Sequence, residues 1–176
     1  RDSNVISLDG KIDFNKYMSR VYDATMEDFE LQANLCFPDV RLRKFIEIRN
    51  HDCVSEDLIY AIPAIYEGIM YNPDALSYME EFFEPFSYSE ISELRYNVVK
   101  NALDAKIKNI KVGDIAREIL STAENSLKVI SPQDIQYLEG IKELTFQNLT
   151  PAEIILKNWY GIWNQDVHKF VKSFIV

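Results

Sequence analysis

Apolar residues recur at helical spacing over most of the chain after residue 55. Ile115, Ile119, Ala123 and Leu127 repeat every fourth residue, which places them in one stripe along a helix. Pro63 is expected to kink a helix that opens near Ser55. Capping residues predict helix starts at Thr25, Ser55, Asn72, Ser87, Ser131 and Thr150.

Between residues 39 and 49 the period changes to two, which is typical of a strand. Val40, Leu42, Ile46 and Ile48 form the aliphatic face. The opposite face carries Arg41, Arg43, Phe45, Glu47 and Arg49. A second strand-like segment, Asn4–Leu8, leads into an Asp9-Gly10 turn. The sequence therefore predicts an α+β fold that is predominantly α-helical, with a short β-strand or antiparallel pair.

The Val40–Arg49 strand is expected to leave one edge open. We expect that edge to pair with Asn4–Leu8 or with another copy of the chain, so self-association is a prediction.

Composition narrows the class of protein. A chain of 176 residues with 47% hydrophobic content can bury one core, so we expect a single domain over residues 1–176. The net charge of -9 opposes binding to nucleic acid or to an anionic membrane surface. No apolar run approaches the roughly 20 residues that span a bilayer. The absence of an initiator Met or signal peptide at Arg1 suggests a fragment or processed chain.

Two cysteines, Cys36 and Cys53, lack the spacing of a metal site or a disulfide framework. They suggest reduced thiols in a cytoplasmic protein.

Glu47 and Arg49 carry the sharpest chemical signal. Residues two apart on a strand project from the same face about 7 Å apart. A carboxylate there could bind a divalent metal, and the guanidinium beside it could bind a phosphate oxygen. The alternative is an ordinary ion pair on a solvated strand.

Three blocks of the sequence resemble plant-type and bacterial glutamate-cysteine ligases. Met26–Arg49, with Asp52 beyond it, resembles the family stretch that reads approximately DWENHLxTxFPEVRLKxYLExRxxD. Ala61–Tyr71 is similar to ALPAxxxGLLY, and Thr150–Gln165 to TPAEKLLELYxGxWxQ. The chain is thus identified as resembling the carboxy-terminal part of such a ligase. Asn50, His51 and Cys53 depart from the family pattern in the loop after the strand.

The resemblance implies an activity. The family joins cysteine to the γ-carboxyl of glutamate in the first step of glutathione synthesis. It uses ATP and magnesium, passes through a γ-glutamyl phosphate, and has an active site like that of glutamine synthetase.

The resemblance also implies roles for four residues. Glu47 matches a magnesium ligand, and Arg49 matches a catalytic arginine that contacts the ATP phosphates. Arg41 is a candidate for contact with glutamate or ATP, with an ion pair to a neighbouring strand as the alternative. Tyr71 is a candidate for the cysteine pocket, with a core position as the alternative.

The same resemblance implies that this chain holds only part of an active site. The remaining metal ligands and the nucleotide cleft would lie in an upstream part of the same enzyme, so the chain alone is expected to be inactive. Two other functions stay open. One is a ligase that joins glutamate to another amine, and the other is a non-catalytic helical interaction module.

Overall fold

The computed structural model describes residues 13–19, 24–52 and 54–174. Helices account for most of these residues, and the strands form two short antiparallel pairs. The expected class, predominantly helical α+β, is therefore confirmed. The predicted strand Asn4–Leu8, the turn after it and Cys53 lie outside the described residues.

The chain divides into two compact units, Arg1–Asp52 and Cys53–Val176. The single domain expected from the length stays a prediction. No helix in the described part of the chain is both long and apolar enough to cross a bilayer.

The first unit contains two helices and one strand pair. Its elements are α1 (Phe14–Met18), α2 (Met26–Leu35), β1 (Val40–Leu42) and β2 (Ile46–Ile48). The start of α2 is fixed by a capping box, in which the Thr25 amide donates to the Asp28 carboxylate at 2.7 Å and the Asp28 amide donates to the Thr25 hydroxyl at 3.4 Å. This is the helix start that the sequence predicts.

The expected continuous strand from Val40 to Arg49 is wrong, because the structure folds it into a hairpin. β1 and β2 pair antiparallel, with Arg41 opposite Glu47. The chain reverses over residues 43–45, where the Arg43 amide donates to the Phe45 carbonyl at 2.8 Å. Beyond β2, the Arg49 amide donates to the Asp39 carbonyl at 2.8 Å, which extends the pairing by one step. Self-association through an open edge stays a prediction.

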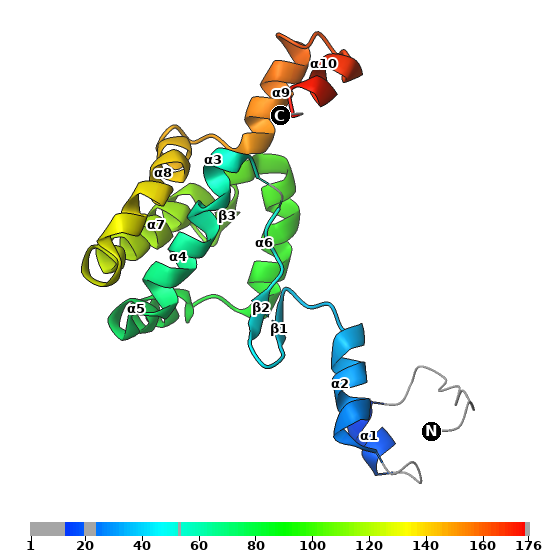
Figure 1. Cartoon of the computed structure of the whole chain (residues 1–176). Helices are drawn as coiled ribbons and strands as arrows, with labels where there is room; N and C mark the ends of the chain where they lie inside the picture. The colour runs from blue at the N-terminus through cyan, green and yellow to red at the C-terminus, as the bar shows by residue number, and fades with distance from the viewer. Residues whose placement is uncertain (1–12, 20–23, 53, 175–176) are drawn as a thin grey trace. The chain divides into compact units, whose positions relative to one another are not determined.

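The second unit is helical apart from one small strand pair (Figure 1). Its first elements are α3 (Glu56–Ile59), α4 (Ala61–Met70), α5 (Pro73–Phe83), α6 (Tyr88–Asn101) and the 3-10 turn η1 (Ala102–Asp104). The strands β3 (Lys106–Ile107) and β4 (Ile110–Lys111) follow. The remaining elements are α7 (Val112–Ile130), the 3-10 segment η2 (Pro132–Leu138), α8 (Glu139–Phe146), α9 (Pro151–Tyr160) and α10 (Val167–Lys172).

The core of the second unit lies where α4 packs along α7. Ala64 of α4 forms one buried cluster with Leu120, Ala123 and Leu127 of α7, and η2 adds Leu138 to it. Ala123, Leu127 and Leu138 are fully buried. Of the predicted stripe, Ala123 and Leu127 belong to this cluster, while Ile115 is buried outside it and Ile119 is half-buried.

The two helix backbones approach closely at Gly68. A β-carbon on Gly68 would stand 2.6 Å from the Ala123 carbonyl oxygen, closer than any ordinary contact. Glycine at this position therefore sets the distance between α4 and α7.

The helix expected from Ser55 to Tyr71 is interrupted at Tyr60 rather than kinked at Pro63. Proline has no amide hydrogen, and its ring clashes with the carbonyl four residues earlier. That carbonyl belongs to Ile59, the last residue of α3. The break therefore falls one turn before the proline that causes it.

The aromatic residues near the carboxy-terminal end pack on one another. Trp163 is buried, and its ring lies 5.3 Å from Phe170, which in turn lies 6.1 Å from Trp159. This edge-on cluster joins α9 to α10.

Candidate functional site

The hairpin brings three of the predicted site residues together, with Arg41 and Arg49 both bound to the carboxylate of Glu47. Glu47 Oε2 accepts from Arg41 Nε at 2.8 Å and lies 2.6 Å from Arg41 Nη2. Glu47 Oε1 accepts from Arg49 Nη1 at 3.0 Å. Because directly opposed residues of an antiparallel pair share a face, the pairing of β1 with β2 is what brings Arg41 to Glu47.

Arg41 points into the unit. It is only 7% exposed, and its Nη1 lies 3.4 Å from the Asn34 carbonyl and 3.3 Å from the Cys36 carbonyl. All three guanidinium nitrogens therefore have a protein acceptor. The ion pair to a neighbouring strand is present in the structure, while contact of Arg41 with glutamate or ATP stays a prediction.

Arg49 is placed differently. Its side chain is 34% exposed, and its Nη1 is the nitrogen that donates to Glu47. In residues 13–19, 24–52 and 54–174, its Nε and Nη2 have no hydrogen-bond acceptor. These two groups form one side of the planar fork, the arrangement that binds two oxygens of a phosphate or carboxylate.

The charges around Glu47 keep it ionised. Hydrogen bonds from Arg41 first, and then from Arg49, lower the pKa of its carboxyl below the ordinary value of 4.5, although partial desolvation acts the other way. The three side chains together carry one net positive charge. The exposed side of this cluster is therefore suited to an anion.

The described residues do not by themselves fit a magnesium ion. Magnesium takes about six oxygen ligands in octahedral geometry. Among the residues that the structure describes, no group of three or more His, Cys, Asp or Glu side chains is placed to hold a metal ion. Both oxygens of Glu47 already accept from cationic groups, which repel a metal. A metal role for Glu47 would need carboxylates from outside these residues.

Phe37 also lies beside the site, a position that the sequence did not predict. The Cζ atoms of Arg41 and Arg49 lie 5.5 and 5.0 Å from the centre of its ring. Both distances are within the roughly 6 Å range of a cation–π contact. The sequence signal for this contact is an aromatic residue just before a strand that carries arginines on one face.

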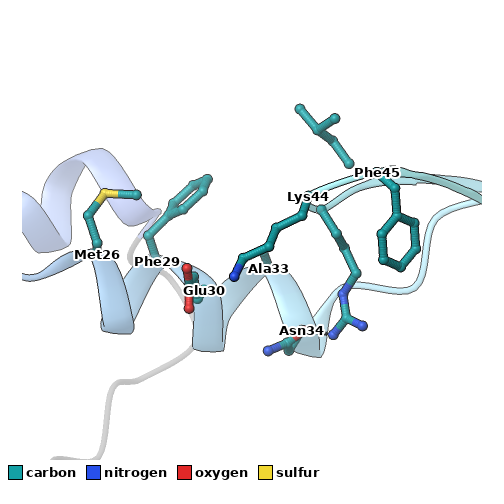
Figure 2. A pocket seen from close by; sticks show the side chains of 9 residues that line it. Met26, Phe29, Glu30, Ala33, Asn34, Lys44 and Phe45 are labelled. Atoms are coloured by element: carbon teal, nitrogen blue, oxygen red, sulfur yellow. Dashed lines mark hydrogen bonds between the residues drawn. The ribbon is translucent and has the colours of Figure 1, made fainter.

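A groove of about 480 Å3 lies in the same unit, between α2 and the hairpin turn (Figure 2). Its apolar lining comes from Met26, Phe29 and Ala33 of α2 together with Leu42 and Phe45 of the hairpin. Polar side chains border it: Glu30, Asn34, Arg43 and Lys44. In the sequence, the signal for this groove is the spacing of three and four between the apolar residues of α2.

The remaining candidates lie on exposed surfaces. Tyr71 follows the last turn of α4 and is 79% exposed, so it is not a core residue. His51 and Asp52 are exposed in the segment after β2. Tyr71 belongs to the second unit, whereas Arg41, Glu47 and Arg49 belong to the first.

Comparison with known proteins gives the site a context. No family model matches the chain. The chain is 27% identical over 143 residues to a chloroplastic glutamate-cysteine ligase of Medicago truncatula, a match that covers 81% of this chain and 28% of the relative. The resemblance to glutamate-cysteine ligases is confirmed.

Other ligases of this name match over the same share of the chain. Chloroplastic glutamate-cysteine ligase A of Oryza sativa subsp. indica is 27% identical over 81% of this chain and 29% of its own length. The Arabidopsis thaliana enzyme is 26% identical over 80% of this chain and 27% of its own length. The chain thus spans between a quarter and a third of the length of the ligases it matches.

These relatives correct one expectation from the sequence. All of them are named chloroplastic, so the predicted cytoplasmic location is contradicted. The prediction rested on two cysteines without a disulfide pattern, a property that does not separate cytoplasm from plastid.

Proposed function

We propose that this chain supplies part of the active site of an ATP- and magnesium-dependent ligase that forms γ-glutamylcysteine from glutamate and cysteine. The observation that carries the proposal is the Glu47–Arg49 pair, in which the guanidinium keeps one side of its fork accessible next to an ionised carboxylate. This pair lies in the block that resembles the family stretch ending in YLExR. The relatives' name supplies the reaction.

The proposed reaction needs a cationic group that binds phosphate. An oxygen of the glutamate γ-carboxylate attacks the terminal phosphorus of ATP, which gives γ-glutamyl phosphate and ADP. The cysteine amine then attacks the acyl carbon, loses a proton and releases phosphate. Negative charge on the transferring phosphoryl group is stabilised by preorganised donors, and Arg49 offers Nε and Nη2 for this task.

The other candidate residues have narrower proposed roles. Glu47 fixes Arg49 and would be one carboxylate of a magnesium site completed from outside the described residues. Arg41 would hold Glu47 in place, because its own donors already have protein acceptors. Tyr71 offers an accessible phenol for the acceptor pocket.

The proposal includes inactivity of the 176-residue chain alone, because it offers one candidate metal-binding carboxylate and spans about 28% of the relatives. The test compares this chain with the full-length product of its gene. Both are supplied with ATP, magnesium, glutamate and cysteine, and γ-glutamylcysteine and ADP are measured. We expect both products from the full-length protein and neither from the isolated chain.

The same assay separates the rival functions. Product formation with another amine, and not with cysteine, would replace the proposed acceptor. A folded full-length protein that releases no ADP with any amine would favour a non-catalytic interaction module. Turnover by the isolated chain, with the host enzyme excluded, would contradict the claim that its site is incomplete.

A further inference from the structure

Phe37 stands beside two guanidinium groups that differ in how they are held. Arg41 is fixed by Glu47 and by two carbonyls at the end of α2. Arg49 is held by one hydrogen bond to Glu47 and by the ring of Phe37, whose centre is 5.0 Å from its Cζ. The loss of Phe37 would therefore affect Arg49 more than Arg41.

The exposure of Phe37 shows that core packing does not account for its position. Phe37 is 68% exposed, and in the part of the chain that the structure describes its charged neighbours are these two guanidinium groups. A large apolar side chain gains little from burial when most of it stays in water. The two cation–π contacts are therefore the specific interactions that the structure gives this ring.

We propose that Phe37 is a positioning residue for Arg49, an inference that rests on the proposed function. The ring face and Glu47 Oε1 together hold the guanidinium so that its Nε and Nη2 side faces the phosphoryl group. A free arginine side chain has many rotamers, and fixing them costs conformational entropy at the moment of binding. The ring reduces that cost in advance. Because the attraction acts through charge, it leaves the N–H donors available to phosphate.

A purely structural role for Phe37 makes a different prediction. If the ring only anchors the hairpin, its replacement would lower stability and would not change how Arg49 meets an anion. The two roles are separated by measuring anion affinity and the environment of Arg49 directly, in protein shown to be folded.

The experiment uses the 176-residue chain and inorganic pyrophosphate as the probe. The variants are Phe37→Leu, which removes the ring, Phe37→Tyr, which keeps it, and Phe45→Leu as a matched control. Phe45 is exposed to a similar degree, at 61%, and lies in the hairpin turn. Pyrophosphate affinity is measured at constant ionic strength, and the Nε–H proton of Arg49 is followed by NMR, assigned with Arg49→Lys.

We expect Phe37→Leu to weaken pyrophosphate binding about two- to five-fold, the size of an exposed cation–π contact. The Arg49 Nε–H signal should lose the upfield shift caused by the ring. Phe37→Tyr should restore both properties, and Phe45→Leu should alter neither. If Phe37→Leu fails to fold in a thermal melt, Phe37→Trp carries the test, with binding at least as tight as that of the natural chain.

Three results would overturn the inference, and they differ in whether the phosphate role of Arg49 survives. The role of Phe37 would be refuted if folded Phe37→Leu showed unchanged affinity and an unchanged Arg49 signal. It would also be refuted if folded Phe37→Trp bound pyrophosphate as weakly as Arg49→Lys does. In both cases the phosphate role of Arg49 would stand. Failure of the natural chain to bind pyrophosphate would refute the phosphate role of Arg49 itself, and the inference with it.

Discussion

Arg41 and Glu47 face each other across the β1–β2 hairpin, with Nε and Nη2 of Arg41 2.8 and 2.6 Å from Glu47 Oε2. Arg41 is buried, so Glu47 is the counter-charge that its burial requires. Glu47 also holds Arg49 through its other oxygen. A single carboxylate therefore joins a structural arginine to the arginine proposed to act on phosphate.

The first prediction concerns the two candidate catalytic side chains in the full-length protein. Arg49→Lys keeps the charge but loses the planar fork, so we expect the rate of ligation to fall by about a hundred- to a thousand-fold. Glu47→Gln should also lower the rate, and higher magnesium should recover part of it. Magnesium should rescue Arg49→Lys poorly. Steady-state kinetics against magnesium and ATP, with a thermal melt for each variant, provide the measurement.

Arg43→Lys is the matched control for this prediction. Arg43 lies on the same hairpin but donates to the Asn34 side chain rather than to Glu47. Its replacement by lysine should leave the rate within about two-fold of normal, as expected for an exposed charge. Near-normal rates in folded Arg49→Lys and Glu47→Gln would reduce the pair to a surface ion pair.

The second prediction is a pH dependence of the hairpin. Because the pKa of Glu47 is lowered by Arg41 and Arg49, its contribution to stability is fully present above about pH 4.5, the ordinary value. It is lost as pH falls through the lower pKa of the folded state. The urea midpoint of the hairpin, followed through the Arg49 amide signal, should therefore drop as pH falls below about 4.5. Glu47→Gln should start lower and drop less, and equal drops in both proteins would contradict the assignment.

The third prediction tests the contact between α4 and α7. Gly68→Ala would place a β-carbon 2.6 Å from the Ala123 carbonyl oxygen and 2.9 Å from the Ala123 α-carbon, both of which are backbone atoms. We expect a loss of about 1–3 kcal/mol in the free energy of unfolding from overpacking. The gain of roughly 1 kcal/mol that alanine brings to a helix offsets part of this loss, so we expect a net loss of up to about 2 kcal/mol. Urea unfolding of the second unit measures the balance.

Gly140→Ala is the control for the close approach. Its β-carbon would meet the end of the flexible Leu58 side chain at 3.0 Å, and that side chain can move. We expect a change of less than about 1 kcal/mol. If Gly140→Ala lost as much stability as Gly68→Ala, the backbone contact at Ala123 would not be the cause of the destabilisation in Gly68→Ala.

The fourth prediction concerns Ser126, which is buried in α7. Its hydroxyl has no hydrogen-bond partner among the residues that the structure describes. Ser126→Ala removes an unsatisfied polar group and improves helix propensity, so the free energy of unfolding should rise by about 1 kcal/mol. Ser121→Ala on the exposed side of the same helix should gain only the smaller propensity term. A destabilised Ser126→Ala would indicate that the hydroxyl has a partner after all.

The helices were predictable where the signal was local. The capping boxes at Thr25, Ser87 and Thr150 form as the sequence predicts, because each needs only a hydroxyl and an acid three residues later. The strand pair β3–β4 was not predicted, because each strand has only two residues and the turn between them, Lys108-Asn109, contains no glycine. Lys108 takes a positive φ of 52° there, a conformation that few sequence signals reveal for lysine.

The hairpin escaped prediction for a geometric reason. Each residue of β1 pairs with a residue of β2 an even number of positions away, as Arg41 does with Glu47. Such pairs share a face in a hairpin and also in one extended strand, so the period of two is the same in both. The turn residues Arg43, Lys44 and Phe45 give no turn signal. The sequence therefore predicted which side chains share a face, but not that Arg41 touches Glu47.

The contacts of Arg41 with the Asn34 and Cys36 carbonyls have a mechanical consequence. These carbonyls lie at the carboxy-terminal end of α2, where helices leave their last acceptors unpaired. One guanidinium thus donates to the carbonyls at the end of α2 and to Glu47 of the hairpin at the same time. Opening the hairpin would release the helix end, so α2 and the β1–β2 pair behave as a single cooperative folding unit rather than as two independent elements.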